Sequence, residues 1–297
     1  QLKSNTNSNF IFTAGQNFDS VNISIDGLGN YFLTDSVLSN YNSSLMVRNG
    51  TFYSNKFNIH VYAFGVGYPD TATAHLGTSK IFCNTFFGND APFMTLNADS
   101  TEIYVEDIFY PGSNQSYNKV NCNWVWGGSD CTIDSLTCIG LIANRYSIST
   151  LIMNNAELRC YSCLVNNAEF KGVTNSYGSM SLYHHATFDS SAWFRYSTYF
   201  DTLLFTTPGS YLSIEDTITT NNFINFNGSC SVFNSIVSSE AGTQNFLRKP
   251  NGAVNFDNVI ISDIDFIGSA TFSATNCFDN GNVSGINLNA PSTRTLY

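Results

Sequence analysis

Charged residues are scarce in this chain of 297 residues, and their scarcity excludes several kinds of partner. Only 11% of the residues are Asp, Glu, Lys or Arg, whereas about 25% is usual in soluble domains. The formal net charge is −10, and no basic run exists, since Arg248-Lys249 is the only adjacent pair of basic residues. Nucleic acid binding relies on clustered Lys and Arg. We therefore expect no nucleic acid partner.

Long apolar runs and helical periodicity are missing as well. No stretch approaches the roughly 18–20 apolar residues that cross a bilayer, so we expect no membrane span. Without helical periodicity, a parallel sheet built from βαβ units is excluded. Phosphate loops, dinucleotide fingerprints and paired Cys-x-x-Cys motifs are absent too. We expect no cofactor and no metal site, with Ca²⁺ as the one ion that paired carboxylates could hold.

Asn, Ser, Thr and aromatic residues are abundant instead. Aromatics make up 15% of the chain, led by 25 Phe and 16 Tyr. This is not the signature of disorder, which combines few aromatics with high charge. Aromatic residues suit β-strands, and Asn and Gly suit tight corners. The composition therefore predicts a fold of strands and turns.

A short repeated unit is the strongest signal in the sequence. Each copy has alternating apolar residues, a polar pair rich in Asn or Asp, and a further apolar residue. Clear copies are Leu45–Phe52, Ile81–Phe86, Ile103–Ile108, Leu151–Leu158, Leu164–Phe170, Leu212–Ile218 and Val254–Ile260. Successive copies are often about 18 to 24 residues apart, the period of a solenoid repeat.

The unit has a direct physical interpretation. Alternation turns one face of a short strand inward, and the Asn or Asp pair lets the backbone turn sharply. One circuit cannot bury its inner face alone, so circuits stack about 4.8 Å apart around a shared core. We predict an all-β, right-handed parallel β-helix over residues 19–288. Residues 1–18 would be a cap or an inter-subunit strand, and residues 289–297 a tail. The competing prediction is an antiparallel β-sandwich or jelly roll.

The repeat resembles that of the right-handed parallel β-helix, or pectin-lyase-like, superfamily of pectate lyases, polygalacturonases, tailspikes and many adhesins. The resemblance covers roughly residues 20–285 and implies the fold, which does not fix a function. Arg248-Lys249-Pro250-Asn251-Gly252 is similar to part of the Arg-x-Pro-x-x-Arg segment of pectate lyases, which implies proton abstraction by Arg248. The final Arg of that segment is replaced by Ala253. The polygalacturonase motifs are missing.

Cysteines and glycosylation motifs suggest export from the cytosol. Eight Cys, an even number, fit an oxidising compartment, and the chain begins at Gln1, which is compatible with removal of a signal peptide. Glycosylation is permitted at six Asn-x-Ser/Thr motifs, although the composition alone gives about this many: Asn22, Asn42, Asn49, Asn114, Asn227 and Asn282. We expect an extracellular protein or one on a cell or virion surface.

We expect two cysteine pairings, one from the alignment of the repeats and one from the ends of a loop. Cys138 and Cys160 fall at equivalent positions of successive circuits, where stacked strands are close enough for a disulfide, and Cys163 competes for the same partner. Cys122 and Cys131 flank an expected loop that a bridge would close. The remaining cysteines, Cys83, Cys230 and Cys277, are far apart in sequence and have no assigned partner.

Three pairs of residues are candidates for function: two Trp, two His and two Asp. Trp124 and Trp126, two apart in an extended segment, would share one face and form a platform for sugar rings or a protein partner. The alternative is that they cover a core edge. The corner pair His184-His185 takes the place of Asn-Asn in other repeats, and its side chains would diverge rather than bind one metal.

The carboxylates of Asp263 and Asp265 would project outward from one strand, about 6.6–7 Å apart. This separation suits an inverting glycoside hydrolase or a Ca²⁺ site, with Glu215-Asp216 as a further contributor. The ordinary alternative is a pair of solvated surface residues.

Because catalytic motifs are missing, the sequence favours an extracellular structural or adhesive protein without catalysis. Its partners would be further copies of itself, assembled as a filament or surface fibre, or a surface glycan. Unpaired strand edges at the ends of a β-helix permit such stacking. The alternative is a polysaccharide lyase or glycoside hydrolase that works in a groove on the outer face.

Overall fold

The computed structural model describes residues 2–6, 8–17, 20–39, 42–67, 71–88 and 94–289. Within these residues the protein is all-β, without a helix, and its parallel strands stack as a β-solenoid of about 14 turns. The predicted parallel β-helix is thereby confirmed, and the antiparallel sandwich is wrong. Residue contacts divide the chain into two units, 1–150 and 151–297.

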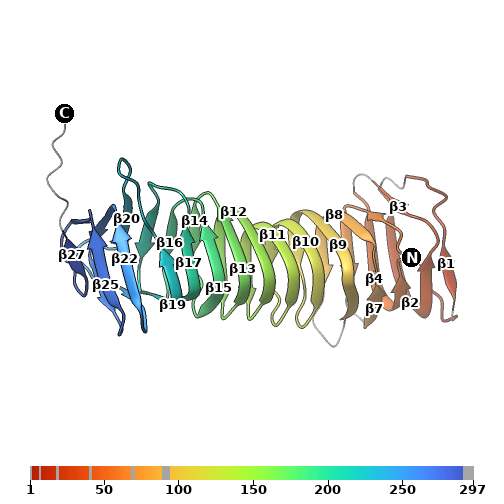
Figure 1. Ribbon diagram of the computed structural model, residues 1–297. Coiled ribbons are helices and arrows are strands. Elements are labelled where there is room, and N and C mark those ends of the chain that lie inside the picture. The colour runs from red at the N-terminus through yellow and green to blue at the C-terminus, as the bar shows by residue number, and fades with distance from the viewer. Residues whose placement is uncertain are drawn as a thin grey trace. The chain divides into compact units, whose positions relative to one another are not determined.

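The first unit contains eleven strands in its described part, and each pairs in parallel with strands of neighbouring circuits (Figure 1). They are β1 (Asn9–Ile11), β2 (Asn22–Leu33), β3 (Val37–Leu38), β4 (Ser44–Tyr53), β5 (Ile59–His60), β6 (Ala63–Val66), β7 (Ala72–His75), β8 (Lys80–Gly88), β9 (Met94–Tyr110), β10 (Ser116–Trp126) and β11 (Thr132–Asn144). The next strand, β12 (Ser147–Tyr161), contains the boundary between the units.

The second unit continues with fifteen further strands in its described part. They are β13 (Leu164–Lys171), β14 (Thr174–Ser176), β15 (Ser181–Phe188), β16 (Ala192–Phe194), β17 (Thr198–Phe205), β18 (Tyr211–Ile214), β19 (Thr217–Asn225), β20 (Asn234–Ser238), β21 (Asn245–Arg248), β22 (Ala253–Asp257), β23 (Val259–Ser262), β24 (Ile264–Ile267), β25 (Thr271–Thr275), β26 (Phe278–Asp279) and β27 (Asn287–Asn289).

Strands of the second unit form three parallel series. One series runs β13-β15-β17-β19-β21-β24, and a second runs β14-β16-β18-β20-β23-β26. The third is the short series β22-β25-β27. A residue on one strand therefore stands beside its counterpart one circuit away. Side chains of the same kind form rows along each series.

Apolar rows of this kind make the core of each unit. In the first unit, paired positions on β4, β6, β8, β9, β10 and β11 hold Leu45, Phe64, Phe86, Phe109, Val125 and Leu141. All six side chains are buried. In the second unit, Phe170, Phe188 and Phe205 stack with ring centroids 4.5 and 5.0 Å apart. These rows are the interior ladders that alternation of apolar residues predicts.

The corners follow the polar pairs seen in the sequence. In β13 and β15 two consecutive residues are exposed in mid-strand, Asn166-Asn167 and His184-His185, and Asn167 pairs with His185 across the two strands. The histidine pair thus takes the corner position, as its alignment with Asn-Asn indicated. His184 Nδ1 lies 2.5 Å from an Asp201 carboxylate oxygen one circuit further on.

Residues of the expected N-terminal segment belong to a circuit in the structure. β1 pairs with Tyr31–Leu33 of β2, Leu2 bridges to Ile25, and the Thr13 amide donates to the Asp35 carboxylate. Gln1, Asn7 and Phe18 of that segment lie outside the described residues, as do residues 290–297 of the expected tail.

Candidate functional site

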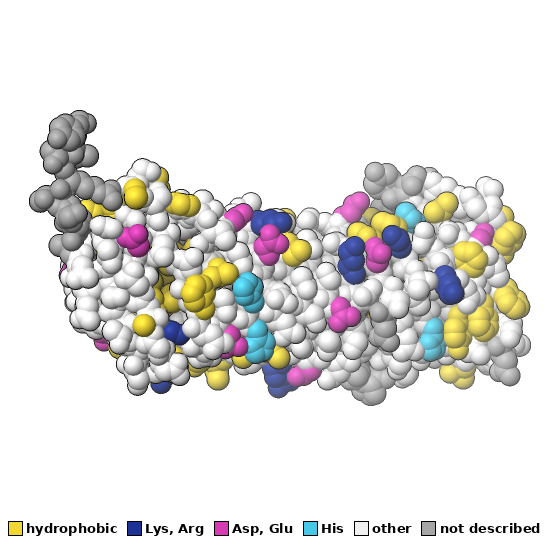
Figure 2. All heavy atoms as spheres, in the orientation of Figure 1, with side chains coloured by type: hydrophobic (Ala, Val, Ile, Leu, Met, Phe, Trp, Pro, Cys, Tyr) yellow, Lys and Arg dark blue, Asp and Glu magenta, His cyan; other side chains and the backbone are white. Residues whose placement is uncertain are grey.

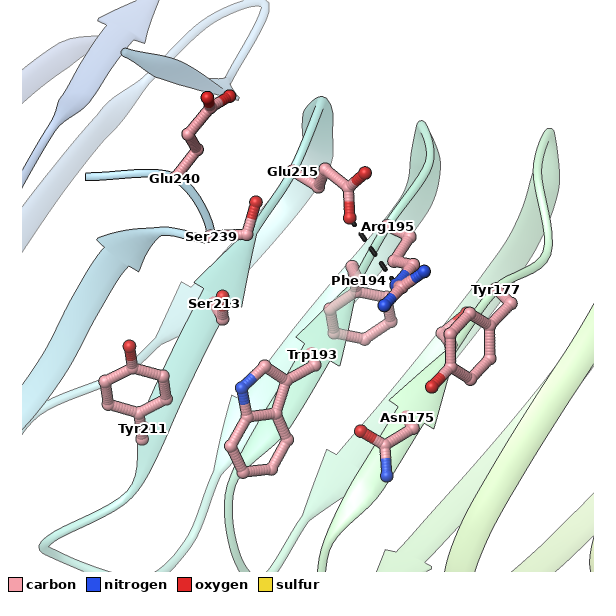
Figure 3. Close-up of a pocket in the computed structure, with 11 residues that line it drawn as sticks. Asn175, Tyr177, Trp193, Phe194, Arg195, Tyr211, Ser213, Glu215, Ser239 and Glu240 are labelled. Atoms are coloured by element: carbon pink, nitrogen blue, oxygen red, sulfur yellow. Dashed lines mark ion pairs between the residues drawn. The ribbon is translucent and has the colours of Figure 1, made fainter. Parts of the chain in front are cut away.

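A groove of about 460 Å³ follows the outer face of the second unit, across β14, β16, β18 and the segment after β20 (Figure 3). Neighbouring strands are about 4.8 Å apart, so the groove extends about 14 Å from the first strand to the last. Most of its residues come from outward positions of the strands or from the corners that follow them, and the buried Ser176 and Phe194 complete the lining. The groove is built from two rows.

The platform row consists of Asn175, Trp193 and Ser213, which pair in register on β14, β16 and β18. Trp193 is the one large side chain in the row, so its small neighbours leave the half-buried indole open to the groove. The Tyr211 ring stands beside it, with the centroids 5.7 Å apart and the rings inclined by 40°. Together the two rings give the groove an apolar surface.

The charged row runs parallel to the platform row, just beyond the ends of the same strands. It contains Tyr177, Arg195, Glu215 and Ser239, and it is bordered by Arg159 of β12, which lies beside Tyr177 one circuit earlier. The guanidinium of Arg195 lies over the Tyr177 ring, 4.7 Å from its centroid, and that of Arg159 lies 5.6 Å from the same centroid. A cation over the face of a ring is attracted by the negative charge of that face. Tyr177 therefore contacts two arginines, one on the circuit before it and one on the circuit after it.

Each arginine also contacts a carboxylate. Arg195 Nε lies 3.6 Å from a Glu215 oxygen, and Arg159 Nη2 lies 3.0 Å from a Glu157 oxygen. Glu240 adds a further carboxylate to the groove lining. Figure 3 shows Arg195 and Glu215 joined by this ion pair above the Trp193 ring. The groove thus combines an open indole with hydrogen-bond donors and acceptors along one side.

A larger hollow of about 760 Å³ lies on the first unit, across β5, β8, β9 and β10. Its aromatic row of His60, Phe82 and Tyr104 has centroids 4.3 and 4.9 Å apart, with adjacent rings nearly parallel. Phe82 is covered by His60 on one face and by Tyr104 on the other, and Lys119 Nζ lies 5.9 Å from the Tyr104 centroid.

Trp124 and Trp126 lie on the outer face of β10, on either side of the buried Val125. The expected shared face is present, but the segment is a strand rather than a loop. Trp124 lies across Gly140 of β11, where a Cβ would stand 2.0 Å from the indole. Trp124 is thereby packed against the sheet, whereas Trp126 is 51% exposed.

The predicted disulfide pairings need correction. The structure joins Cys160 to Cys163, at the end of β12 and just before β13, instead of joining either one to Cys138. Cys138 follows Thr137, which pairs with Asn121, so it stands beside Cys122 on β10. Both are free thiols, as is Cys131. The Ser147 amide donates to the Cys131 carbonyl, so β12 follows β11 with an offset of about 15 residues, whereas Cys138 and Cys160 are 22 residues apart. The repeat alignment was therefore wrong in register, and the two cysteines are not at equivalent positions.

Burial raises the pKa of these thiols. The pKa of Cys122 rises to about 12, and those of Cys83 and Cys138 rise further, since an apolar surrounding disfavours the thiolate. A thiol with a raised pKa is a weak nucleophile. These cysteines therefore act as core side chains.

Asp263 and Asp265 are engaged by the following circuit. Asp263 lies at a corner with φ of 57° and accepts a hydrogen bond from Asn282, which is the main reason why its pKa is lowered. Asp265, on β24, accepts from Ser284. Arg248 is the last residue of β21, and Phe246 of the same strand pairs with Asp265. These contacts give both carboxylates a role in joining circuits, and no group of three His, Cys, Asp or Glu suited to a metal occurs among the described residues.

Five of the six Asn-x-Ser/Thr asparagines are exposed, and Asn49 is half-buried. Asn282 uses its side-chain amide on Asp263 and on the Gly242 carbonyl. Within the described residues no helix could cross a bilayer.

Sequence reasoning missed the groove residues, apart from Glu215. A signal was available, because Asn175, Trp193 and Ser213 recur at the repeat spacing, as do Tyr177, Arg195 and Glu215. Aligning outward positions of the repeats, in addition to inward ones, collects both rows.

Comparison of the chain with protein-family models, with curated proteins and with solved structures finds no match.

Proposed function

We propose that this protein is an extracellular adhesive or structural β-helix that binds a glycan, without catalysis, through the groove of its second unit. The observation that carries the proposal is the open indole of Trp193 beside the charged row. Sugar rings have an apolar face that packs on an aromatic ring and hydroxyls that need donors and acceptors at the edge. Trp193 supplies the aromatic ring, and Arg195 and Glu215 supply the hydrogen-bond donors and acceptors.

The wider setting supports a role outside the cell. Cys160–Cys163 is a disulfide, and disulfides persist mainly in oxidising compartments. Charged side chains are also few on the face shown in Figure 2, where most of the surface is white. Such a surface of hydroxyl and amide groups suits contact with glycans or with further copies of the chain. We also assign the solenoid to the right-handed, pectin-lyase-like type, on its stacked parallel series and its polar corners.

Catalysis is the competing function, because Glu215 and Glu240 line the same groove. A glycosidase needs one carboxyl as an acid and another as a base or nucleophile. Glu215 is instead 46% exposed and ion-paired with Arg195. In this position the Glu215 oxygens are accessible to accept hydrogen bonds from a ligand.

The test is binding to a panel of immobilised polysaccharides, followed by titration of the best ligand against intrinsic fluorescence. Trp193→Ala removes the platform, and losing burial of one indole face costs about 2 kcal/mol, or about 30-fold in Kd. Trp126→Ala is the matched control, because it removes an exposed indole from the first unit. We expect loss of binding in the first variant and unchanged binding in the second.

Circular dichroism of both variants checks that the fold is kept. Absence of binding to every glycan, or equal affinity of Trp193→Ala and the unsubstituted protein, contradicts the proposal. Reducing or unsaturated ends that accumulate with time establish the enzyme instead.

A further inference from the structure

The charges along the groove balance one another almost completely. Arg159 faces Glu157, Arg195 faces Glu215, and Glu240 adds one more negative charge. Two cations and three carboxylates give this surface a net charge of −1. A ligand with a carboxylate or sulfate on each sugar would therefore meet no net attraction.

The arginines are nevertheless well placed to donate hydrogen bonds. Tyr177 lies between the guanidinium groups of Arg159 and Arg195 and holds them beside the platform row. Both arginine side chains are about half exposed, at 51% and 56%. A guanidinium has five N–H donors, so contact with one carboxylate leaves donors for sugar hydroxyls.

From this balance we propose that the ligand is an uncharged polysaccharide, lying along the stack of strands, and that Glu215 determines this specificity. The inference rests on the proposed glycan-binding function. Glu215 neutralises Arg195 at the point where an acidic sugar would otherwise pair with the guanidinium. With Glu215 in place, neutral polysaccharides can still bind through hydrogen bonds, whereas the binding of acidic polysaccharides is weakened.

The direction of the bound polysaccharide follows from the two rows of groove residues. Both rows run from β14 towards β20, with the open indole near the middle of the groove. A polysaccharide lying in this direction contacts polar side chains of several circuits in turn. A chain that crossed the rows would contact only one circuit. Long oligosaccharides should therefore bind more tightly than a disaccharide of the same type.

The experiment compares neutral polymers (a glucan, a mannan and a galactan) with acidic polymers (polygalacturonate, alginate and hyaluronate) at low salt and at 0.15 M salt. Glu215→Gln frees Arg195 while keeping the shape of the side chain. Glu169→Gln is the matched control, because Glu169 is also half exposed and ion-paired, with Lys171, outside the groove lining. Both variants change the net charge of the protein equally.

We expect the unsubstituted protein to bind a neutral polymer with little dependence on salt and to bind acidic polymers at least tenfold more weakly. Glu215→Gln should gain affinity for acidic polymers by about two- to fivefold, the scale of one exposed ion pair. This gain should shrink as salt screens the new contact. Glu169→Gln should match the unsubstituted protein.

Preference of the unsubstituted protein for an acidic polymer overturns the inference while leaving the glycan-binding function standing. Equal behaviour of Glu215→Gln and Glu169→Gln overturns the role of Glu215. Binding to no polymer of either kind contradicts the proposed function itself, so the two failures are distinguishable.

Discussion

Replacing Phe188 by Ala tests whether the stacked interior row stabilises the second unit. Phe188 is 1% exposed. Its ring lies between Phe170 and Phe205, at centroid distances of 4.5 and 5.0 Å, and meets the edges of Phe194 and Phe200. The substitution leaves a cavity in the core of three circuits. Hydrogen bonds between their strands fix the spacing of the backbones, so the circuits cannot close over the cavity.

The expected loss follows from these contacts. Replacing a buried Phe by Ala costs about 3–5 kcal/mol in well-packed cores. Contacts on both ring faces place Phe188 near the middle of that range, at about 4 kcal/mol. With a dependence of about 3 kcal/mol per molar urea, the unfolding midpoint falls by about 1.3 M.

The assay is urea unfolding followed by circular dichroism and by fluorescence in a Trp124→Phe, Trp126→Phe background. The chain has 3 Trp, so Trp193 then reports on the second unit alone. Phe223→Ala serves as the control, since Phe223 lies on β19 but is 53% exposed. A loss below about 1.5 kcal/mol for Phe188→Ala, or a loss equal to that of the control, refutes the reasoning, because truncation of a rigidly packed ring cannot be that mild.

Three further predictions concern single contacts. The pKa of Lys249 is lowered by burial, and its ammonium donates to the carbonyls of Asn221 and Asn222 at 2.9 and 2.7 Å. Between the lowered folded pKa and the unfolded value of about 10.4, the unfolded chain binds more protons than the folded one. As pH rises towards about 10.4, the free energy of unfolding of the protein should therefore increase relative to that of Lys249→Met, as measured by urea unfolding. A difference between the two that stays constant over this range contradicts the burial argument. The pKa of Asp201 is lowered by hydrogen bonds from Asn221 and His184. The ionised Asp201 should therefore stabilise the fold above pH 3.8, and this contribution should disappear as pH falls through the lowered folded pKa. If Asp201→Asn and the unsubstituted protein unfold identically in acid, these contacts do not stabilise the fold. Peptide mapping without reduction should recover Cys160 linked to Cys163, and replacing both by Ala should cost about 2 kcal/mol, given the short loop; a peptide that links Cys138 to either one would restore the pairing expected from the repeat.

The sequence by itself determined the fold class. Alternation in copies such as Leu164–Phe170 places Val165, Ala168 and Phe170 inward and leaves Asn166 and Asn167 at a corner, and the structure has this arrangement. The reason is local, since strand geometry turns alternate side chains to opposite faces and Asn tolerates the corner backbone. A repeated local pattern then permits only stacking, because one circuit cannot bury its own inner face.

Only the tertiary structure decided which side chains are neighbours across circuits. The number of residues between paired positions varies from 14 between Ser273 and Asn287 to 29 between Ile218 and Leu247, because loops of different length intervene. Cysteine pairing and the groove both depend on this register. Trp193 became part of a site because small residues stand on both sides of it one circuit away, and that is a property of three strands together rather than of any one segment.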